Sequence, residues 1–329
     1  MAKKYTLKKS SLPEEASRRL QQFQIDYRNE LNPAQYEAVV SVNGPHLIIA
    51  GAGTGKTRTI TYRVAYLVEL GVKPESILLL TFTRRAAQEM LRRASILLDS
   101  RCEKVAGGTF HSFANTVLRQ YAPLIKFESS FTILDQGDAE DVVNLLRTQT
   151  RVDTKERRFP RKQTLFDIFS KAVNTHQHVK AILKEEYPHY EEYLDEILAL
   201  QKAYEVYKAK HNLMDYDDLL LYLCKLLRDH ENVRRTLSDR FRYIMVDEYQ
   251  DTNRIQAEIV RLLASRHNNV MVVGDDSQSI YSFRGATIRN ILEFPEEFSG
   301  CKIIKLEENY RSTQPILNLT NEILRRARD

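Results

Sequence analysis

A glycine-rich stretch, AGAGTGKT, has residue types and spacing suited to holding phosphate groups. It consists of Ala50, Gly51, Ala52, Gly53, Thr54, Gly55, Lys56 and Thr57. The glycines let backbone N–H groups turn toward phosphate oxygens, the lysine supplies positive charge, and the threonine hydroxyl can ligate Mg²⁺. The first position of the usual G-x-x-x-x-G-K-[ST] pattern is alanine here. The stretch predicts binding of a nucleoside triphosphate together with Mg²⁺.

Two other kinds of structure share features with this stretch. A dinucleotide-binding turn also has closely spaced glycines, but its G-x-G-x-x-G spacing differs and it lacks the phosphate lysine. A glycine-rich turn that merely precedes a lysine would bind nothing. The apolar residues 47–49 directly before the stretch suit a buried strand. They favour the phosphate-binding loop, which joins such a strand to a helix.

A pair of carboxylates follows a second apolar run, residues 242–246, much later in the chain. At its end stand Asp247 and Glu248. We expect Asp247 to hold the hydration shell of Mg²⁺ and Glu248 to orient and deprotonate the attacking water. The alternative is an acidic strand end without a role. Lys56 and Asp247 are 191 residues apart, so a compact nucleotide site requires an insertion between them.

A third polar segment, VGDDSQSIYSFRGA, occupies residues 273–286 and also follows an apolar run. Its Gln278 is neutral and can contact a γ-phosphate without competing with the metal. Tyr281, Phe283 and Arg284 form an aromatic and basic cluster of the kind that stacks on bases and contacts phosphates. Such a cluster can equally be core packing. Its position after Gln278 indicates a link between the nucleotide and a nucleic acid.

Alternating strand and helix patterns surround these motifs. Strands are predicted at residues 47–49, 77–82, 242–246, 269–273 and 302–306, and helices at residues 33–42, 56–70 and 84–98. This alternation is typical of an α/β fold with a parallel sheet flanked by helices. From about residue 112 to 212 the pattern is helical, with the longest helix expected at residues 191–211. We therefore expect a lead-in at residues 1–30, a sheet domain formed by residues 31–111 and 213–329, and a helical insertion at residues 112–212.

The composition restricts the class of protein. Hydrophobic residues make up 43% of the 329 residues and charged residues 28%, as in ordinary soluble domains. No apolar stretch approaches the roughly 20 residues of a membrane span. The three cysteines form no C-x-x-C pair, which argues against disulfides and zinc and predicts a cytoplasmic protein. Residues 1–111 carry 17 basic and 10 acidic groups, which favours a polyanionic partner.

Taken together, the motifs resemble those of one family. Gln35, AGAGTGKT, TFTRRAAQEM (81–90), GTFHSF (108–113), DYDDLL (215–220), VDEYQDTN (246–253), VGDDSQSIYSFRGA and ENYRS (308–312) occur in this order. From Leu31 onward the chain resembles the UvrD/Rep/PcrA type of superfamily 1 DNA helicases. The resemblance implies a P-loop, RecA-like ATP-binding domain with a helical accessory insertion.

The same resemblance implies a role for particular residues. Gln35 would read the adenine edge, Tyr310 would stack on the adenine, Arg58 would line the nucleotide, and Arg311 would reach the γ-phosphate. Lys56, Glu248, Gln278 and Arg311 would form the catalytic set. Single-stranded DNA would be contacted by Phe82, Thr83, Thr109, His111, Tyr281, Phe283 and Arg284.

The resemblance also implies an activity, that of an ATP-dependent DNA helicase or translocase moving 3′→5′ on single strands and at single-strand/duplex junctions. Phe283 stands where this family usually has tryptophan, and Arg84 and Arg85 replace a common Asn-Lys pair. The family continues into a second RecA-like domain that is not in these 329 residues, so we expect the N-terminal half of a motor. Two alternatives stay open: the helicase half of a helicase–nuclease, or a truncated regulator that binds ATP or DNA without moving.

Overall fold

A computed structural model describes residues 23–149, 159–275 and 287–327 of the chain. Its main sheet contains β1 (His46–Ala50), β2 (Ile77–Thr81), β3 (Ala106–Thr109), β6 (Tyr243–Val246), β7 (Val270–Gly274) and β8 (Lys302–Leu306). All neighbouring pairs are parallel, in the order β3-β2-β6-β7-β1-β8. Parallel strands end at one common edge, so the polar segments that follow them are brought together there.

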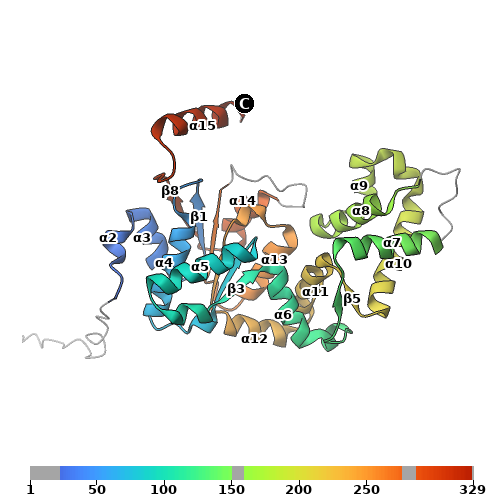
Figure 1. The fold of residues 1–329 in the computed structure, drawn as a ribbon, viewed down its shortest axis with the longest axis horizontal. Coiled ribbons are helices and arrows are strands. Elements are labelled where there is room, and N and C mark those ends of the chain that lie inside the picture. The colour runs from blue at the N-terminus through green and yellow to red at the C-terminus, as the bar shows by residue number, and fades with distance from the viewer. Residues whose placement is uncertain (1–22, 150–158, 276–286, 328–329) are drawn as a thin grey trace, which may run out of the picture.

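Helices cover both faces of this sheet (Figure 1). On one face lie α3 (Pro33–Val40), α4 (Lys56–Glu69) and α5 (Arg84–Leu97). On the other lie α6 (Phe110–Tyr121), α11 (Tyr216–Asp229), α12 (Glu231–Arg240), α13 (Arg254–Ala264) and α14 (Arg289–Glu297). The predicted α/β fold with a parallel sheet flanked by helices is confirmed, and each predicted strand is present to within one residue at either end.

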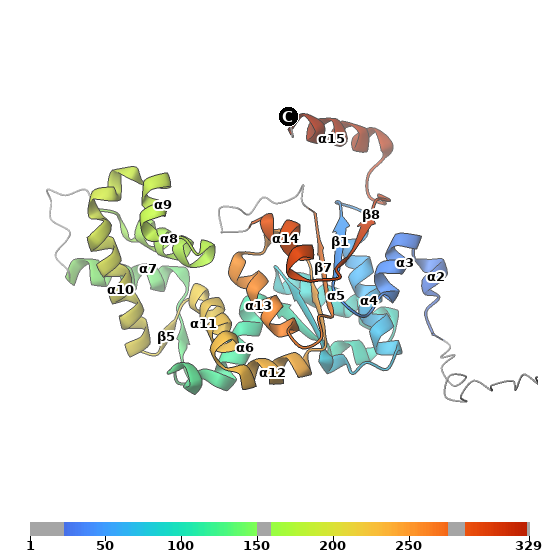
Figure 2. The same cartoon turned by 180° about the vertical axis from the view of Figure 1, so that it is seen from behind.

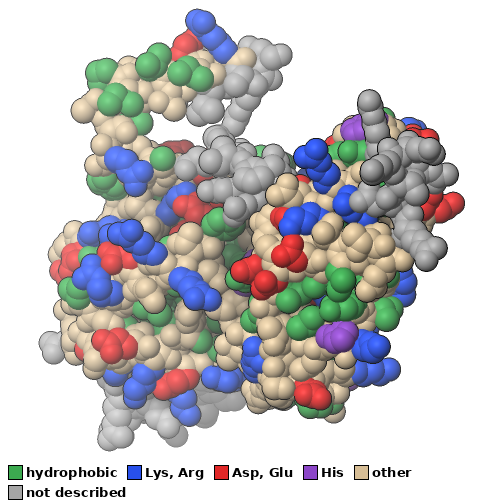
Figure 3. All heavy atoms as spheres, turned by 45° about the vertical axis from the view of Figure 1, so that its right-hand side comes forward, with side chains coloured by type: hydrophobic (Ala, Val, Ile, Leu, Met, Phe, Trp, Pro, Cys, Tyr) green, Lys and Arg blue, Asp and Glu red, His purple; other side chains and the backbone are tan. Residues whose placement is uncertain are grey.

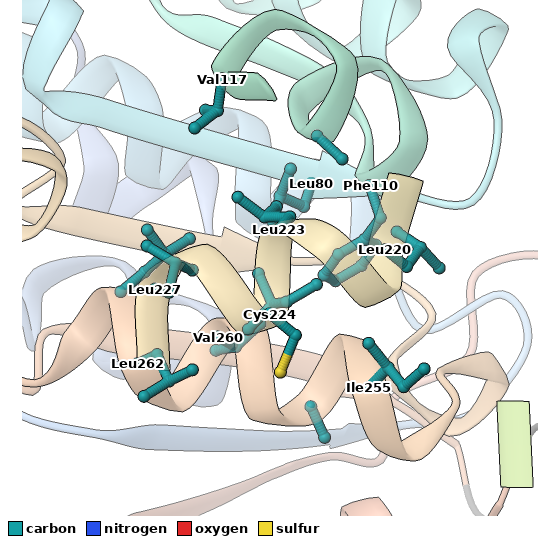
Figure 4. Close-up of a cluster of buried hydrophobic side chains, with 14 of the residues drawn as sticks. Leu80, Phe110, Val117, Leu220, Leu223, Cys224, Leu227, Ile255, Val260 and Leu262 are labelled. Carbon is teal, nitrogen blue, oxygen red and sulfur yellow. The ribbon is translucent and has the colours of Figure 1, made fainter. Parts of the chain in front are cut away.

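Successive side chains of each strand point to opposite faces of the sheet, as the pleat of a strand requires. Leu80 of β2 joins the core under α6, α11 and α13, whereas its neighbour Leu79 joins the core under α4 and α5. Figure 4 shows the first of these cores, where Leu220 and Leu223 of α11 pack between β2 and α13. Burial on both faces explains why the strand sequences are almost continuously apolar.

The segment expected as a lead-in is part of the fold from residue 23 onward. Ile25 and Tyr27 of the α2 region (Tyr27–Glu30) are buried against Tyr62 and Ala65 of α4. Tyr27 also donates a hydrogen bond to Glu69. The aromatic side chains fix this N-terminal segment to the helix that begins with Lys56, so the sheet domain begins before residue 31.

The inserted helices form a lobe beside the sheet, visible in the views from either side (Figures 1 and 2). The lobe contains α7 (Gln136–Gln149), α8 (Lys162–Thr175), α9 (Val179–Glu186) and α10 (Leu194–Lys210), and a short 3₁₀ turn (Pro188–Tyr193) precedes α10. Its core is separate from both cores of the sheet domain and runs from Leu134 to Tyr204.

The boundary of the insertion differs from the expected residue 112, which falls inside α6. This helix packs in the sheet core through Phe110, Ala114 and Leu118, and Phe131 belongs to the same core. The chain then enters the lobe through β4 (Thr132–Ile133) and leaves it through β5 (Leu213–Met214), and these two strands pair in parallel. We therefore infer that the insertion spans about residues 132–214.

The last described helix, α15 (Gln314–Ala327), stands away from the sheet domain in both views (Figures 1 and 2). Across the described part of the chain, no helix is both long enough and apolar enough to span a bilayer.

Candidate nucleotide site and DNA cleft

The phosphate-binding loop connects β1 to α4, as the sequence predicted. Gly53 and Gly55 have left-handed backbone angles, with φ of 81° and 91°. Between them, the Thr54 hydroxyl donates to the carbonyl of Gly51 at 2.8 Å and fixes the turn. Lys56 is the first residue of α4, so backbone N–H groups and the lysine lie at a helix N-terminus, where anions are favoured.

The segment after β8 lies directly against this loop. Asn309 Nδ2 donates to the carbonyl of Ala52 at 2.6 Å, and the backbone N–H of Tyr310 donates to the carbonyl of Gly53 at 2.9 Å. A Cβ atom on Gly53 would lie only 2.6 Å from Cβ of Arg311. The predicted nucleotide residues Tyr310 and Arg311 are thus held beside the phosphate loop, far apart in sequence but adjacent in space.

Gln35 approaches the loop from its other side. Its side chain is 1% exposed and donates from Nε2 to the carbonyl of Thr54 at 3.0 Å. Asn32 and Gln35 form a reciprocal capping box at the start of α3. Asn32 also donates to the Tyr310 hydroxyl at 2.8 Å. These contacts gather Gln35 and the exposed Tyr310 ring at one end of the loop, where an adenine could meet both.

Arg58, the third predicted residue at this end, is anchored by the N-terminal segment. Its guanidinium donates to the carbonyl of Glu30 at 2.8 Å and lies over the Tyr62 ring, 4.6 Å from the centroid. Tyr62 in turn donates to the Glu30 carboxylate. Residues 27–30 therefore help to orient a side chain expected to line the nucleotide.

Two charged residues of the predicted catalytic set, Lys56 and Glu248, form an ion pair. Lys56 Nζ lies 2.7 Å from Glu248 Oε2. Glu248 occupies a tight turn after β6 with φ of 51°, a left-handed conformation that is unusual for glutamate. Such backbone strain persists where the surrounding structure enforces it, often at functional sites. The turn places this carboxylate beside the phosphate loop.

Gln250, which the sequence analysis missed, supports this turn. It donates from Nε2 to Glu248 Oε2 at 2.9 Å, and its Oε1 accepts a hydrogen bond from the backbone N–H of Asp275 at 3.1 Å. Gln250 therefore connects the ends of β6 and β7. An amide two residues after the carboxylate pair was the only signal in the sequence.

Asp247 has the surroundings expected of a metal ligand. Its side chain is 5% exposed, and among the described residues its buried Oδ1 has no hydrogen-bond partner. Burial, followed by the nearby charge of Glu248, raises the pKa of the Asp247 carboxyl to about 7. A cation at Oδ1 would satisfy this atom and favour the ionised form. The orphaned oxygen fits the predicted Mg²⁺ site.

Few protein ligands suffice for Mg²⁺, which is usually bound by one or two carboxylates together with phosphate oxygens and water. Consistent with this, the described residues contain no group of three His, Cys, Asp or Glu side chains able to hold a metal ion alone. Thr57, beside Lys56 at the start of α4, supplies the second predicted ligand.

Four predicted residues, Gln278, Tyr281, Phe283 and Arg284, lie outside the described residues. The last described residue before them is Asp275, whose carboxylate is 3.8 Å from the Cβ position of Gly51. Asp275 therefore lies beside the phosphate loop.

The predicted DNA residues of β2 and β3 lie at the same edge of the sheet. Phe82 directly follows β2 and is 37% exposed. Thr83 and Thr109 act as N-caps of α5 and α6, where their hydroxyls accept hydrogen bonds from backbone N–H groups at 3.1 Å. Burial lowers the pKa of the His111 imidazole to about 4, so His111 is neutral at pH 7. These three polar residues would contact a strand without adding positive charge.

A cleft of about 780 Å³ separates this edge from the inserted lobe. Its walls include Phe82, His111 and Tyr216 on the sheet side and Phe166 and Tyr187 on the lobe side. Tyr216, also missed, is 51% exposed and meets the His111 ring edge-on, with centroids 5.8 Å apart. Its place in DYDDLL, an aromatic residue among aspartates at a helix start, was the available signal.

The cleft also contains many carboxylates. The acidic residues that line it include Asp135, Asp167, Glu186, Asp217 and Asp251, in addition to Asp247 and Glu248. In Figure 3, which brings the lobe side forward, hydrophobic and acidic side chains both gather on the visible face. Because carboxylates repel phosphates, this interior suits bases better than a phosphodiester backbone.

The parallel sheet, the glycine loop at the start of α4 and the acidic end of β6 define a RecA-like P-loop domain. The chain belongs to the UvrD helicase family: residues 31–299 match the UvrD/REP helicase N-terminal domain.

Similar proteins include the ATP-dependent DNA helicase PcrA of Staphylococcus aureus strain Mu50, 38% identical over 299 residues. PcrA of Staphylococcus epidermidis strain ATCC 12228 is 38% identical over 297 residues. Each match covers 90% of this chain but only 40% of the relative's own length.

Proposed function

We propose that this chain is the ATP-binding N-terminal part of an ATP-dependent DNA helicase or translocase that moves 3′→5′ on single-stranded DNA. The observation that carries the proposal is the placement of Lys56, Asp247 and Glu248 at the same sheet edge as Phe82. Hydrolysis and strand binding would thus share one set of strand ends. Membership of the UvrD helicase family supports this assignment.

The chain's own residues supply distinct parts of ATP hydrolysis. The backbone of residues 50–57 and Lys56 bind the phosphates, while Gln35, Arg58 and Tyr310 orient the base. Asp247 and Thr57 hold Mg²⁺, which neutralises charge on the phosphate oxygens when it is bound. Glu248 accepts the proton of the attacking water once its pairing with Lys56 is broken. Arg311, beside Gly53, reaches the transferred phosphate.

Single-stranded DNA would bind along the outer rim of the cleft. Arg84 and Arg85 open α5 just beyond Phe82 and the capping residue Thr83, and they would contact phosphates. Phe82 and Tyr216 would stack on bases that point into the acidic interior. This arrangement keeps the backbone away from the carboxylates, and it accepts any base because stacking does not read sequence.

Tyr310 and Arg311 are exposed beside the phosphate loop, so a bound nucleotide would be open to solvent on that side. Movement on DNA would require a second surface that closes over the nucleotide there. We propose that the rest of a longer protein supplies a second RecA-like domain there, as the coverage of its relatives suggests. Opening and closing of the gap between the two domains would move single strands past the stacking residues and act at single-strand/duplex junctions. We place this activity in the cytoplasm.

The test is ATP hydrolysis by the full-length protein with and without single-stranded DNA, beside the 329-residue chain. DNA-stimulated hydrolysis by the full-length protein, together with unwinding of duplexes carrying a 3′ but not a 5′ tail, is expected. Binding of ATP and DNA without hydrolysis would instead identify a regulator. Nuclease activity encoded beyond Asp329 would identify a helicase–nuclease.

A further inference from the structure

A buried chain of amide side chains joins the inserted lobe to the catalytic edge. Asn174 lies near the end of α8, Asn253 caps α13, and Asn290 lies in the first turn of α14. None of the three is more than 9% exposed. Asn253 Nδ2 donates to Asn174 Oδ1 at 2.7 Å, and this hydrogen bond crosses from the sheet domain to the lobe.

In both Asn174 and Asn253, the amide nitrogen and the amide oxygen of the side chain have hydrogen-bond partners. Asn174 Nδ2 donates to Asp217 Oδ1 at 2.8 Å and to the Ser170 carbonyl at 2.9 Å. Asn253 Oδ1 accepts from the backbone N–H of Gln256 at 2.9 Å. Because leaving a buried polar atom without a partner costs about 1–3 kcal/mol, the pair holds α8 against α13 in one arrangement.

The same pair is connected to the turn that carries Glu248. Asn253 lies five residues further along this segment, and the Thr252 hydroxyl beside it donates to the Tyr249 carbonyl at 2.6 Å. Asn290 Nδ2 donates to the carbonyls of Thr252 and Asn253 at 2.9 and 3.0 Å. The turn after β6 and the start of α14 therefore meet at the residue that contacts the lobe.

Helix α8 also lines the DNA cleft, from Phe166 to Asn174, and Asn253 lies in the same lining. Phe166 is eight residues before Asn174 on this helix. A helix rises about 1.5 Å per residue and is stiff over this length, so displacement of α8 at Phe166 also displaces Asn174. Asn174 thus links the lobe wall of the cleft to the Glu248 turn.

We propose that Asn174 and Asn253 are positioning residues that couple DNA in the cleft to ATP hydrolysis. The inference rests on the proposed function. A DNA strand that contacts the lobe wall displaces α8 or restricts its motion, and the amide pair transmits this change to residues 248–253. Neither residue belongs to the set proposed to hold ATP, so we expect their effect to be confined to the stimulation by DNA.

Two variants of the full-length protein break the bond from opposite sides. Asn253→Ser keeps a side-chain oxygen able to cap α13 but is too short to reach Asn174. Asn174→Ala removes the partner on the lobe. The matched control is Thr175→Ala, which removes a hydroxyl that donates to the Lys171 carbonyl and to Gln177 in the same segment. Thermal unfolding midpoints show whether each variant is folded. If Asn174→Ala does not fold, the proposal is tested with Asn253→Ser alone.

We expect the DNA-free hydrolysis rate and the KM for ATP to stay at wild-type values in both variants. The maximal DNA-stimulated rate should fall about two- to tenfold, the range that follows from losing one hydrogen bond. The double variant should fall no further than the larger single effect, because both changes remove the same bond. Thr175→Ala should behave as wild type.

Two outcomes would overturn the coupling role while leaving the proposed function standing. One is wild-type stimulation in both variants. The other is an equal loss of DNA-free and DNA-stimulated rates, which would indicate a merely structural pair. A wild-type protein that hydrolyses ATP without any response to DNA would overturn the proposed function itself, and the coupling role with it.

Discussion

Lys56 Nζ and Glu248 Oε2 lie 2.7 Å apart, so the group expected to bind phosphate and the expected general base form one ion pair. Oε2 of Glu248 accepts a hydrogen bond from Lys56 and another from Gln250, so this oxygen is occupied while the ion pair is intact. Phosphate oxygens that draw Lys56 away would free Glu248 to accept a proton. The contact therefore ties activation of the base to arrival of the substrate phosphates.

Glu248→Gln should preserve ATP binding and lower turnover by the full-length protein at least about a hundredfold, the usual size of a general-base contribution. The neutral amide can still accept a hydrogen bond from Lys56 but cannot take a proton from water. Steady-state hydrolysis and equilibrium binding of labelled ATP measure the two effects separately. Glu103→Gln, an exposed change far from the site, is the control. Turnover at the wild-type rate would rule out Glu248 as the base.

Gly53→Ala should abolish tight ATP binding. Gly53 has φ of 81°, and an added Cβ would lie 2.6 Å from Cβ of Arg311, so the segment after β8 must move away from the loop. Gly300→Ala is a matched control, because Gly300 has φ of 77° with no atom within 4 Å of the added Cβ. Both variants should lose about 1–2 kcal/mol of stability to backbone strain. Equal loss of ATP affinity in both would show that close packing at Gly53 is irrelevant.

Phe82→Ala and Tyr216→Ala should each weaken binding of single-stranded DNA by about 1–3 kcal/mol, the contribution of one stacked base. Affinity for ATP should not change, since both rings line the cleft, whose lining includes no residue of the phosphate loop. Fluorescence anisotropy of a labelled oligonucleotide measures the first quantity. Val206→Ala removes a similarly exposed apolar side chain from α10, away from the cleft, and should have no effect. Parallel loss of DNA and ATP affinity would indicate a damaged fold instead of lost stacking.

Lys208→Met should destabilise the sheet-to-lobe junction by about 3–5 kcal/mol, because it leaves buried carboxylates without their cation. Lys208 Nζ lies 2.6 Å from both Asp215 and Asp218, and all three side chains are buried. Burial lowers the pKa of Lys208, but the two carboxylates outweigh this and raise it. Denaturant unfolding at pH 7 measures the loss.

The same variant should be less destabilised in acid than in base. Burial, followed by the charge of Asp215, raises the pKa of Asp218, and Lys208 opposes that rise. Without Lys208 the folded-state pKa rises further above the unfolded value, so stability is retained at low pH and lost as pH increases through the folded-state pKa. The deficit relative to wild type should therefore be smaller at pH 6 than at pH 8. A deficit independent of pH would mean that lost packing, not charge, causes the effect.

The sequence predicted the main sheet because strands buried on both faces are continuously apolar, as in Ile77–Thr81. It did not predict β3, whose residues Ala106–Thr109 include two glycines, a residue type depleted in strands. Nor did it predict β4 and β5, which have two residues each and form only because distant segments meet. Strands this short carry no periodicity.

The sequence suggests site residues where a motif couples residue type to a known chemistry, and Lys56 and Glu248, named in this way, lie in contact in the structure. Gln250 and Tyr216 were not named, because their roles depend on neighbours from other strands and helices: Asp275 for the first and His111 for the second. The edge of the insertion was misplaced for a related reason. An amphipathic helix such as α6 looks the same whether it covers a sheet or joins a bundle of helices.

The paired strands at the base of the lobe bring its two ends together, with Thr132 opposite Leu213 and Ile133 opposite Met214. The chain thus returns to the point at which it departed, and the lobe's core shares no residue with the cores on the sheet. Segments whose ends adjoin in this way can be exchanged or resized as units without reordering the host fold. A change in the size or sequence of the lobe can therefore leave the strand order of the main sheet unaltered.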